Sequence, residues 1–169
     1  MKQVIIVFVT WVIGLLQVQG QQVGKPVPAF RLEDSEGHFI NLADFEGKVV
    51  VIDIWYTGCS SCAYFYQHVL SGIENEFLSK NEVVFISVST DKDRKCWLKS
   101  VAGGNYTSSK LINVYTGGKG FQHALLTFYD VERFPYLLII DKKGNLHAAI
   151  DTVNHYSTEQ ITQLIKDVH

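Results

Sequence analysis

Two cysteines, Cys59 and Cys62, are separated by two residues, a spacing shared by zinc sites, haem attachment sites, structural disulfides and redox-active pairs. A structural zinc site needs two further ligands, usually from a second paired element, and Cys96 is the one cysteine left. Covalent haem attachment needs histidine directly after the second cysteine, where this chain has Ala63. The pair therefore favours thiol–disulfide exchange, with a structural disulfide or an inert pair as the alternative.

The position of the pair between two expected elements supports the redox interpretation. Residues 49–56 are apolar on both faces, which is typical of a central strand covered by helices, and residues 63–78 carry apolar side chains near helical spacing. Cys59 is then expected at the N-terminus of a helix, where unpaired backbone N–H groups favour a thiolate. Cys62, three residues on, can close the disulfide. We therefore predict that Cys59 is the nucleophile and Cys62 the resolving thiol.

Asp53 interrupts the apolar run six residues before Cys59. A buried carboxylate without a partner is costly, so burial should raise the pKa of Asp53. A raised pKa would allow this carboxyl group to exchange a proton with Cys62 near neutral pH. The alternative is that Asp53 points into a solvated gap or caps a neighbouring element.

Phe134, Pro135 and Tyr136 lie immediately before an apolar strand expected at residues 137–140. A proline at the start of a strand can be an edge feature. It can also follow a cis peptide bond, in a turn that brings the backbone close to the cysteines. The residues alone leave both readings open.

The rest of the chain alternates strand and helix patterns, which predicts one α/β domain with a mixed sheet. Ser157 is expected to cap the last helix, with Gln160 placed to complete a capping box. Cys96 falls in an expected helix beside Trp97 and is expected to be a buried core thiol. We expect strands at residues 30–33, 38–42, 49–56, 83–89, 111–115, 135–141 and 146–150, and helices at residues 63–78, 91–101, 122–129 and 157–168.

The first twenty residues have the parts of a secretory signal: a positive start at Lys2, an apolar run over residues 4–16, and small or β-branched residues at the two positions that a signal peptidase reads, before a cleavage point near Gly20. The apolar run is shorter than the ~20 residues that span a bilayer comfortably as a helix. We expect residues 1–20 to be a signal peptide and residues 21–169 to form one domain. An uncleaved membrane tether is the alternative.

Charge and cysteine content narrow the function further. The net charge of −2 gives no reason to expect nucleic acid or an anionic membrane as a partner. Export would place the chain where disulfides persist, yet it has only three cysteines. The cysteines are therefore expected to do chemistry rather than to staple the fold.

Three segments resemble the TlpA/ResA-like branch of the thioredoxin-like proteins. They are the active-site strand and loop at residues 51–62, the lead-in at residues 24–30 and 42–48 with the Gly37 hairpin, and the cis-proline segment at residues 134–141 with Gly144. The resemblance covers residues 23–168. It implies a thioredoxin fold, with a central mixed β-sheet flanked by helices and an N-terminal β-hairpin extension. It also implies a cis Pro135 that faces the disulfide.

The resemblance further implies an exported thiol–disulfide oxidoreductase, located in the periplasm or cell envelope if the source is bacterial. We expect a monomer that exchanges disulfides with partner proteins, without a cofactor or metal. Most relatives are kept reduced by a membrane electron donor, which favours a reductase. The residues expected to act are Cys59, Cys62, Asp53 and Pro135 in catalysis, and Trp55, Gly58, Ser60, Ser61, Phe134 and Tyr136 in docking the partner.

Three positions depart from the family pattern. Gly58 stands where tryptophan is usual, Ser61 where proline is frequent, and Tyr136 where threonine is frequent. The small residues are expected to leave the sulfurs more open and the start of the helix less rigid. The redox potential and the partner depend on these positions, so neither follows from the resemblance.

Copper(I) delivery is the main alternative function. A thiolate pair is a soft ligand set, and a distant histidine such as His123 or His147 could complete it. Copper-delivery relatives usually have wider cysteine spacing, which favours the oxidoreductase.

Overall fold

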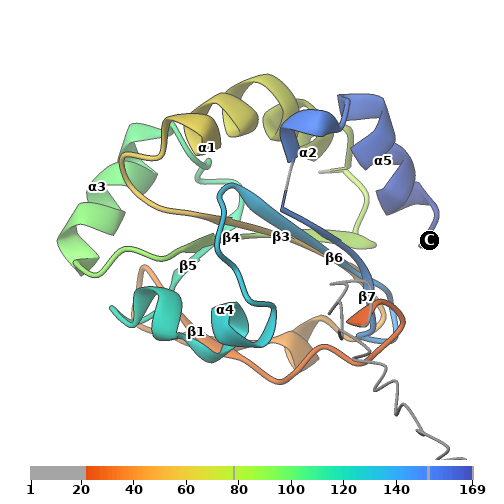
Figure 1. Ribbon diagram of the computed structural model, residues 1–169, viewed down its shortest axis with the longest axis horizontal. Helices are drawn as coiled ribbons and strands as arrows, with labels where there is room; N and C mark the ends of the chain where they lie inside the picture. The colour runs from red at the N-terminus through yellow and green to blue at the C-terminus, as the bar shows by residue number, and fades with distance from the viewer. Residues whose placement is uncertain (1–21, 78, 152, 169) are drawn as a thin grey trace, which may run out of the picture.

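The computed structural model describes residues 22–77, 79–151 and 153–168 and arranges them around one seven-stranded sheet (Figure 1). The strand order is β2-β1-β5-β4-β3-β6-β7. β4 runs parallel to β3 and β5, whereas β6 runs antiparallel to β3, so the sheet is mixed as predicted. The strands are β1 (Arg31–Asp34), β2 (Phe39–Asn41), β3 (Val49–Trp55), β4 (Val83–Ser89), β5 (Ile112–Tyr115), β6 (Tyr136–Ile140) and β7 (Leu146–Ile150).

β3 is an interior strand of the sheet, between β4 and β6, and is buried along its whole length. Helices cover both faces, which explains why its sequence is apolar at successive positions. α1 (Ser60–Phe65), α2 (Ser71–Phe77) and α5 (Thr158–Lys166) pack on one face, and α4 (Ala124–Phe128) packs on the other (Figure 1). α3 (Arg94–Gly103) contributes Trp97 to a cluster at the cysteine pair.

The long helix expected after the cysteines is divided by a wide turn. α1 and α2 are joined by a π-helical turn over Tyr66–Leu70. Apolar side chains recur every four residues, at Phe65, Val69, Ile73 and Phe77, which is longer than the α-helical repeat of 3.6. A π turn holds more residues than an α turn, so it keeps this stripe facing the sheet.

The N-terminal hairpin extends the sheet beyond β5. β1 pairs antiparallel with both β2 and β5, which confirms the predicted extension. The guanidinium Nε of Arg94 in α3 lies 3.1 Å from a carboxylate oxygen of Glu33 in β1 and links the hairpin to the helix.

The capping box at Ser157 is confirmed, because its hydroxyl accepts the N–H of Gln160 and the Gln160 side chain accepts the N–H of Ser157. The expectation for Cys96 is wrong, since Cys96 is an exposed free thiol. Trp97, the next residue, occupies the buried face of α3, and neighbouring positions of a helix point in different directions.

The predicted signal peptide, residues 1–20, lies outside the described residues. Within those described, no helix is both long enough and apolar enough to span a bilayer.

Candidate active site

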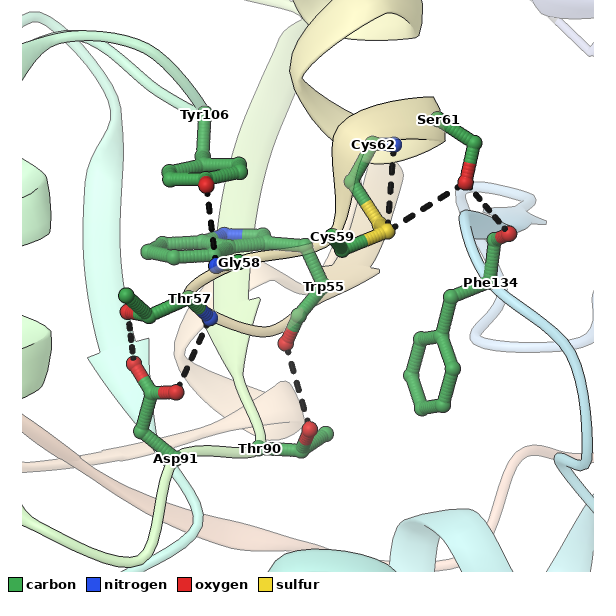
Figure 2. The surroundings of a disulfide bond; sticks show 10 residues. All are labelled: Trp55, Thr57, Gly58, Cys59, Ser61, Cys62, Thr90, Asp91, Tyr106 and Phe134. Carbon is green, nitrogen blue, oxygen red and sulfur yellow. Dashed lines mark hydrogen bonds between the residues drawn. A yellow bond between two sulfur atoms is a disulfide. The ribbon is translucent and has the colours of Figure 1, made fainter.

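The cysteine pair forms a disulfide where the chain passes from β3 to α1 (Figure 2). The two Cα atoms are 5.3 Å apart. Cys59 is the N-cap of α1, and its Sγ accepts a hydrogen bond from the backbone N–H of Cys62 at 3.1 Å. The sulfur of Cys59 thus lies at the helix start, where a backbone donor favours negative charge.

Both cysteines are buried, at 3% and 2% exposed. The expectation that small neighbours would leave the sulfurs open is therefore wrong. The pair belongs to one buried hydrophobic cluster with Trp55, Trp97 and Tyr115. These three aromatic residues come from β3, α3 and β5, so the burial of the pair involves residues other than the small ones beside the cysteines.

Thr57, in the loop that leads to the cysteines, is held by a carboxylate. Its N–H and its Oγ donate to the two oxygens of Asp91, at 2.9 and 2.6 Å (Figure 2). The same Oγ lies 2.7 Å from the hydroxyl oxygen of Ser100 in α3. The loop after β3 is therefore tied to the segment that follows β4.

Tyr106 supports the same loop from its other side. Its ring stacks on Trp55 with centroids 4.8 Å apart, and its hydroxyl accepts the N–H of Gly58 at 2.9 Å (Figure 2). The indole N–H of Trp55 donates to the hydroxyl of Ser87 at 2.7 Å. Trp55 is fully buried, so its ring supports the loop and does not reach the surface where a partner would dock.

Sequence reasoning missed both Asp91 and Tyr106. Asp91 falls at the start of an expected helix, and Tyr106 lies in a segment rich in glycine, serine, threonine and asparagine. No short-range pattern marks either residue, because each acts through a contact to a distant part of the chain.

Asp53 is buried within β3, at 4% exposed, and in the described part of the chain its Oδ1 has no hydrogen-bond partner. Alternation along the strand places it on the same face as Val51 and Trp55, the face that α1 covers. Desolvation raises the pKa of this carboxyl group from its usual 3.8 to about 8. Neither a solvated gap nor a capping role describes this environment.

The peptide bond between Phe134 and Pro135 is cis, as the resemblance implied. The hydroxyl of Ser61 donates to the carbonyl oxygen of Phe134 at 3.2 Å, so the first turn of α1 contacts the segment before β6 (Figure 2). The ring of Phe134 packs edge-on against Tyr56 and Phe121, with centroids 5.2 and 5.3 Å apart. Tyr56 and Phe121 are exposed, so an aromatic rim borders the site.

The expected docking residues divide into surface and interior groups. Gly58 and Ser60 are exposed, and Ser61 and Phe134 are partly so. The Tyr136 side chain is buried in the core on the α4 side of the sheet, and burial raises its pKa to about 12. Tyr136 as a whole is 2% exposed and pairs with Ile54 of β3, so it is not part of the surface that a partner would contact.

The described residues contain no group of three or more His, Cys, Asp or Glu side chains placed to hold a metal ion. His123, suggested as a copper ligand, is the N-cap of α4, on the face of the sheet opposite α1. Its Nδ1 accepts the N–H of Leu125 at 3.3 Å, and its Nε2 lies 3.4 Å from the carbonyl oxygen of Arg31.

Residues 47–146 match the family model described as thioredoxin-like. The chain belongs to the thioredoxin-like family. Thiol–disulfide oxidoreductase ResA of Bacillus cereus is 24% identical over 99% of this chain and 94% of its own length. The Bacillus subtilis ResA is 26% identical over 73% of this chain, and the match spans 64% of that protein.

Solved structures agree with this assignment. The thioredoxin domain of a thiol–disulfide oxidoreductase from Bacteroides vulgatus has a TM-score of 0.71 and 26% identity, covering 87% of this chain and 98% of its own. A thiol:disulfide interchange protein from a Bacteroides species has a TM-score of 0.70 and 26% identity, covering 86% and 90%. With its closed cysteine pair, this thioredoxin-like protein is a thiol–disulfide oxidoreductase.

The conformation of Gly58 gives a first test. Its φ is +94°, and no atom lies within 4 Å of the position that a Cβ would take, so backbone conformation rather than space favours glycine. We expect Gly58→Ala to lower the free energy of unfolding by about 1–2 kcal/mol. Gly72→Ala, in the first turn of α2 with equal space around it, should be neutral or stabilising by up to about 1 kcal/mol. Urea unfolding of the oxidised proteins measures both, and equal effects would contradict this explanation.

The buried carboxyl group gives a second test, through the pH dependence of stability. Between about pH 4 and pH 8 the folded state keeps a proton on Asp53 that the unfolded state has lost, so stability falls as pH rises through this interval. Asp53→Asn removes this dependence. The oxidised variant should therefore be more stable than the wild type above pH 8, by an amount on the order of a few kcal/mol.

The difference between the two proteins should shrink as pH falls toward 4, because the wild-type carboxyl group is then protonated in both states. Urea unfolding at several pH values measures it. A stability difference that does not vary with pH would show that Asp53 does not hold its proton in the folded protein.

Proposed function

We propose that this chain is an exported disulfide reductase that exchanges disulfides with partner proteins. The observation that carries the proposal is the position of Cys59 at the N-cap of α1, in a disulfide with Cys62 and beside the segment of cis Pro135. A thiolate is favoured at such a position, and a nearby backbone segment can align an incoming chain.

The exchange proceeds through a mixed disulfide. The thiolate of Cys59 attacks one sulfur of a partner disulfide, and the partner's other sulfur leaves as a thiolate that takes a proton. Cys62 then attacks the sulfur of Cys59 and releases the second partner thiolate. The partner gains two electrons, and the Cys59–Cys62 disulfide forms.

In this scheme Asp53 accepts the proton of the Cys62 thiol. Its carboxyl group lies on the face of the sheet that α1 covers, and its pKa of about 8 is close to the working pH. A group with such a pKa can both accept and return a proton, so Asp53 assists the deprotonation of Cys62 before the resolving attack.

The partner chain docks along the backbone at Phe134 and Pro135. Phe134 is partly exposed, and Tyr56 and Phe121 expose their rings beside it. An extended segment around a partner cystine can hydrogen-bond to the backbone there and rest apolar side chains on these rings. Gly58, Ser60 and Ser61 border the same surface.

Export rests on the signal pattern of residues 1–20, which would place the domain in the periplasm or cell envelope of a bacterium. The direction of electron flow rests on the family resemblance. In that scheme a membrane electron donor transfers two electrons to the pair and restores the two thiols after each cycle, and the protein works as a monomer.

Trapping the mixed disulfide tests the assignment of the two cysteines. We expect Cys62→Ser to accumulate a covalent complex with a disulfide-containing protein such as insulin, because no resolving thiol remains. Cys59→Ser should form no complex and lose insulin reduction. Non-reducing electrophoresis and a turbidity assay measure these outcomes.

Cys96→Ser is the matched control, since Cys96 is the exposed free thiol outside the pair. It should retain full activity, and the traps are best made in this background. Full activity of Cys59→Ser would contradict the proposal. Copper delivery instead predicts tight, stoichiometric Cu(I) binding that is lost on substitution of His123 or His147, together with weak exchange, so a Cu(I) titration separates the two functions.

The equilibrium reduction potential of the pair tests the direction. A reductase is expected near the thioredoxin value of about −270 mV, whereas a strong oxidant lies near about −120 mV. Equilibration of the Cys96→Ser protein with glutathione buffers, followed by alkylation and mass spectrometry, measures the potential. A potential near about −120 mV would contradict the reductase assignment but would leave thiol–disulfide exchange as the activity.

A further inference from the structure

The hydroxyl of Ser61 lies between two acceptors that the exchange reaction uses at different stages. Its Oγ is 3.4 Å from the sulfur of Cys59 and 3.2 Å from the carbonyl oxygen of Phe134 (Figure 2). A serine hydroxyl carries one proton, so it can donate to only one of them at a time. In the disulfide form the hydroxyl donates to the Phe134 carbonyl, while its Oγ also lies within hydrogen-bond distance of the Cys59 sulfur.

The charge on Cys59 decides which acceptor is preferred. A neutral disulfide sulfur is a weak acceptor, and a peptide carbonyl is a strong one. A thiolate is charged, and hydrogen bonds to charged groups are about twice as strong as neutral ones. Reduction of the pair therefore redirects the Ser61 hydroxyl hydrogen bond from the Phe134 carbonyl to the Cys59 sulfur, with only a rotation about the Cβ–Oγ bond.

We propose that Ser61 is a positioning residue that couples the redox state of the pair to partner docking. The inference rests on the proposed function and deepens it. In the reduced protein the hydroxyl stabilises the Cys59 thiolate together with the N–H of Cys62, which is already 3.1 Å from the sulfur. The Phe134 carbonyl is then free to accept a backbone N–H of the partner.

The oxidised protein reverses both effects. Once the Cys59–Cys62 disulfide has formed, the sulfur no longer attracts the proton, and the hydroxyl returns to the Phe134 carbonyl. The backbone acceptor that held the partner is then occupied from within the chain. Docking weakens when the partner has been reduced, which favours release of the product.

The pKa of Cys59 in the reduced protein tests the first effect. We expect Ser61→Ala to raise it by about one unit, so that the thiolate fraction well below the pKa falls about tenfold. Ser60→Ala, at the exposed neighbouring position, should leave the pKa unchanged, and Ser61→Thr, which keeps a hydroxyl, should restore it. The measurement is the pH dependence of iodoacetamide alkylation in the Cys96→Ser background, with Cys59 identified by peptide mass spectrometry.

The affinity for an extended peptide tests the second effect. The probe is the insulin B chain with both cysteines replaced by serine, which docks without exchange. Wild-type protein should bind it several-fold more tightly when reduced than when oxidised. The two redox forms of Ser61→Ala should bind it equally, because neither has a hydroxyl to occupy the Phe134 carbonyl. A peptide titration monitored by NMR measures the dissociation constants of the reduced and oxidised forms of each protein.

The outcomes separate this inference from the proposed function. An unchanged Cys59 pKa in Ser61→Ala overturns the inference. The inference also fails if the pKa shifts but the reduced and oxidised forms of Ser61→Ala differ in affinity for the peptide as much as the wild-type forms do. Either result leaves the reductase assignment intact as long as Cys59→Ser loses insulin reduction. If Cys59→Ser keeps that activity, the proposed function fails first.

Discussion

The burial of the Asp53 carboxyl group in the central strand is the constraint on which the site depends. Among the described residues no hydrogen bond to Oδ1 replaces the water that this atom loses, and burial raises the pKa of the carboxyl group to about 8. The cost is offset by apolar side chains on both faces of β3, which is buried along its whole length. That packing also fixes the end of the strand. Cys59 follows four residues after that end, at the N-cap of α1.

The topology of the sheet explains why distant segments meet at the cysteines. β4 is the parallel neighbour of β3, so the loops that follow the two strands leave the sheet at the same edge, and Asp91 can reach Thr57. β6 is the antiparallel neighbour on the other side, with Tyr136 paired to Ile54. Its beginning therefore lies beside the end of β3, which brings the cis-proline segment to the disulfide. The strand order thus brings together the cysteine loop after β3, the segment after β4 and the cis-proline segment before β6.

Sequence reasoning recovered what is encoded over short distances. The central strand, the redox pair that follows it, the buried carboxyl and the capping box at Ser157 each leave a local pattern, and the structure contains all four. Tyr106 and Asp91 leave none, since their roles arise only when the sheet forms. Cys96 was misjudged for a related reason: residue type alone indicated burial, whereas the neighbouring Trp97 occupies the inward face of the helix. The π turn was not predicted, although the sequence contains the apolar repeat of four that it accommodates.

The small residues at Gly58 and Ser61 bear on two properties of the pair: its burial and the electrostatic environment of the Cys59 sulfur. In this chain the pair is buried in a cluster with aromatic residues of β3, α3 and β5, so its burial involves elements other than the loop that carries it. A residue beside the cysteines can then change without opening the disulfide to water. Ser61 thus provides a hydroxyl close to the reacting sulfur where a proline would provide no donor, and it does so inside an unchanged cover. The electrostatics of Cys59 can therefore be tuned at this position independently of its burial.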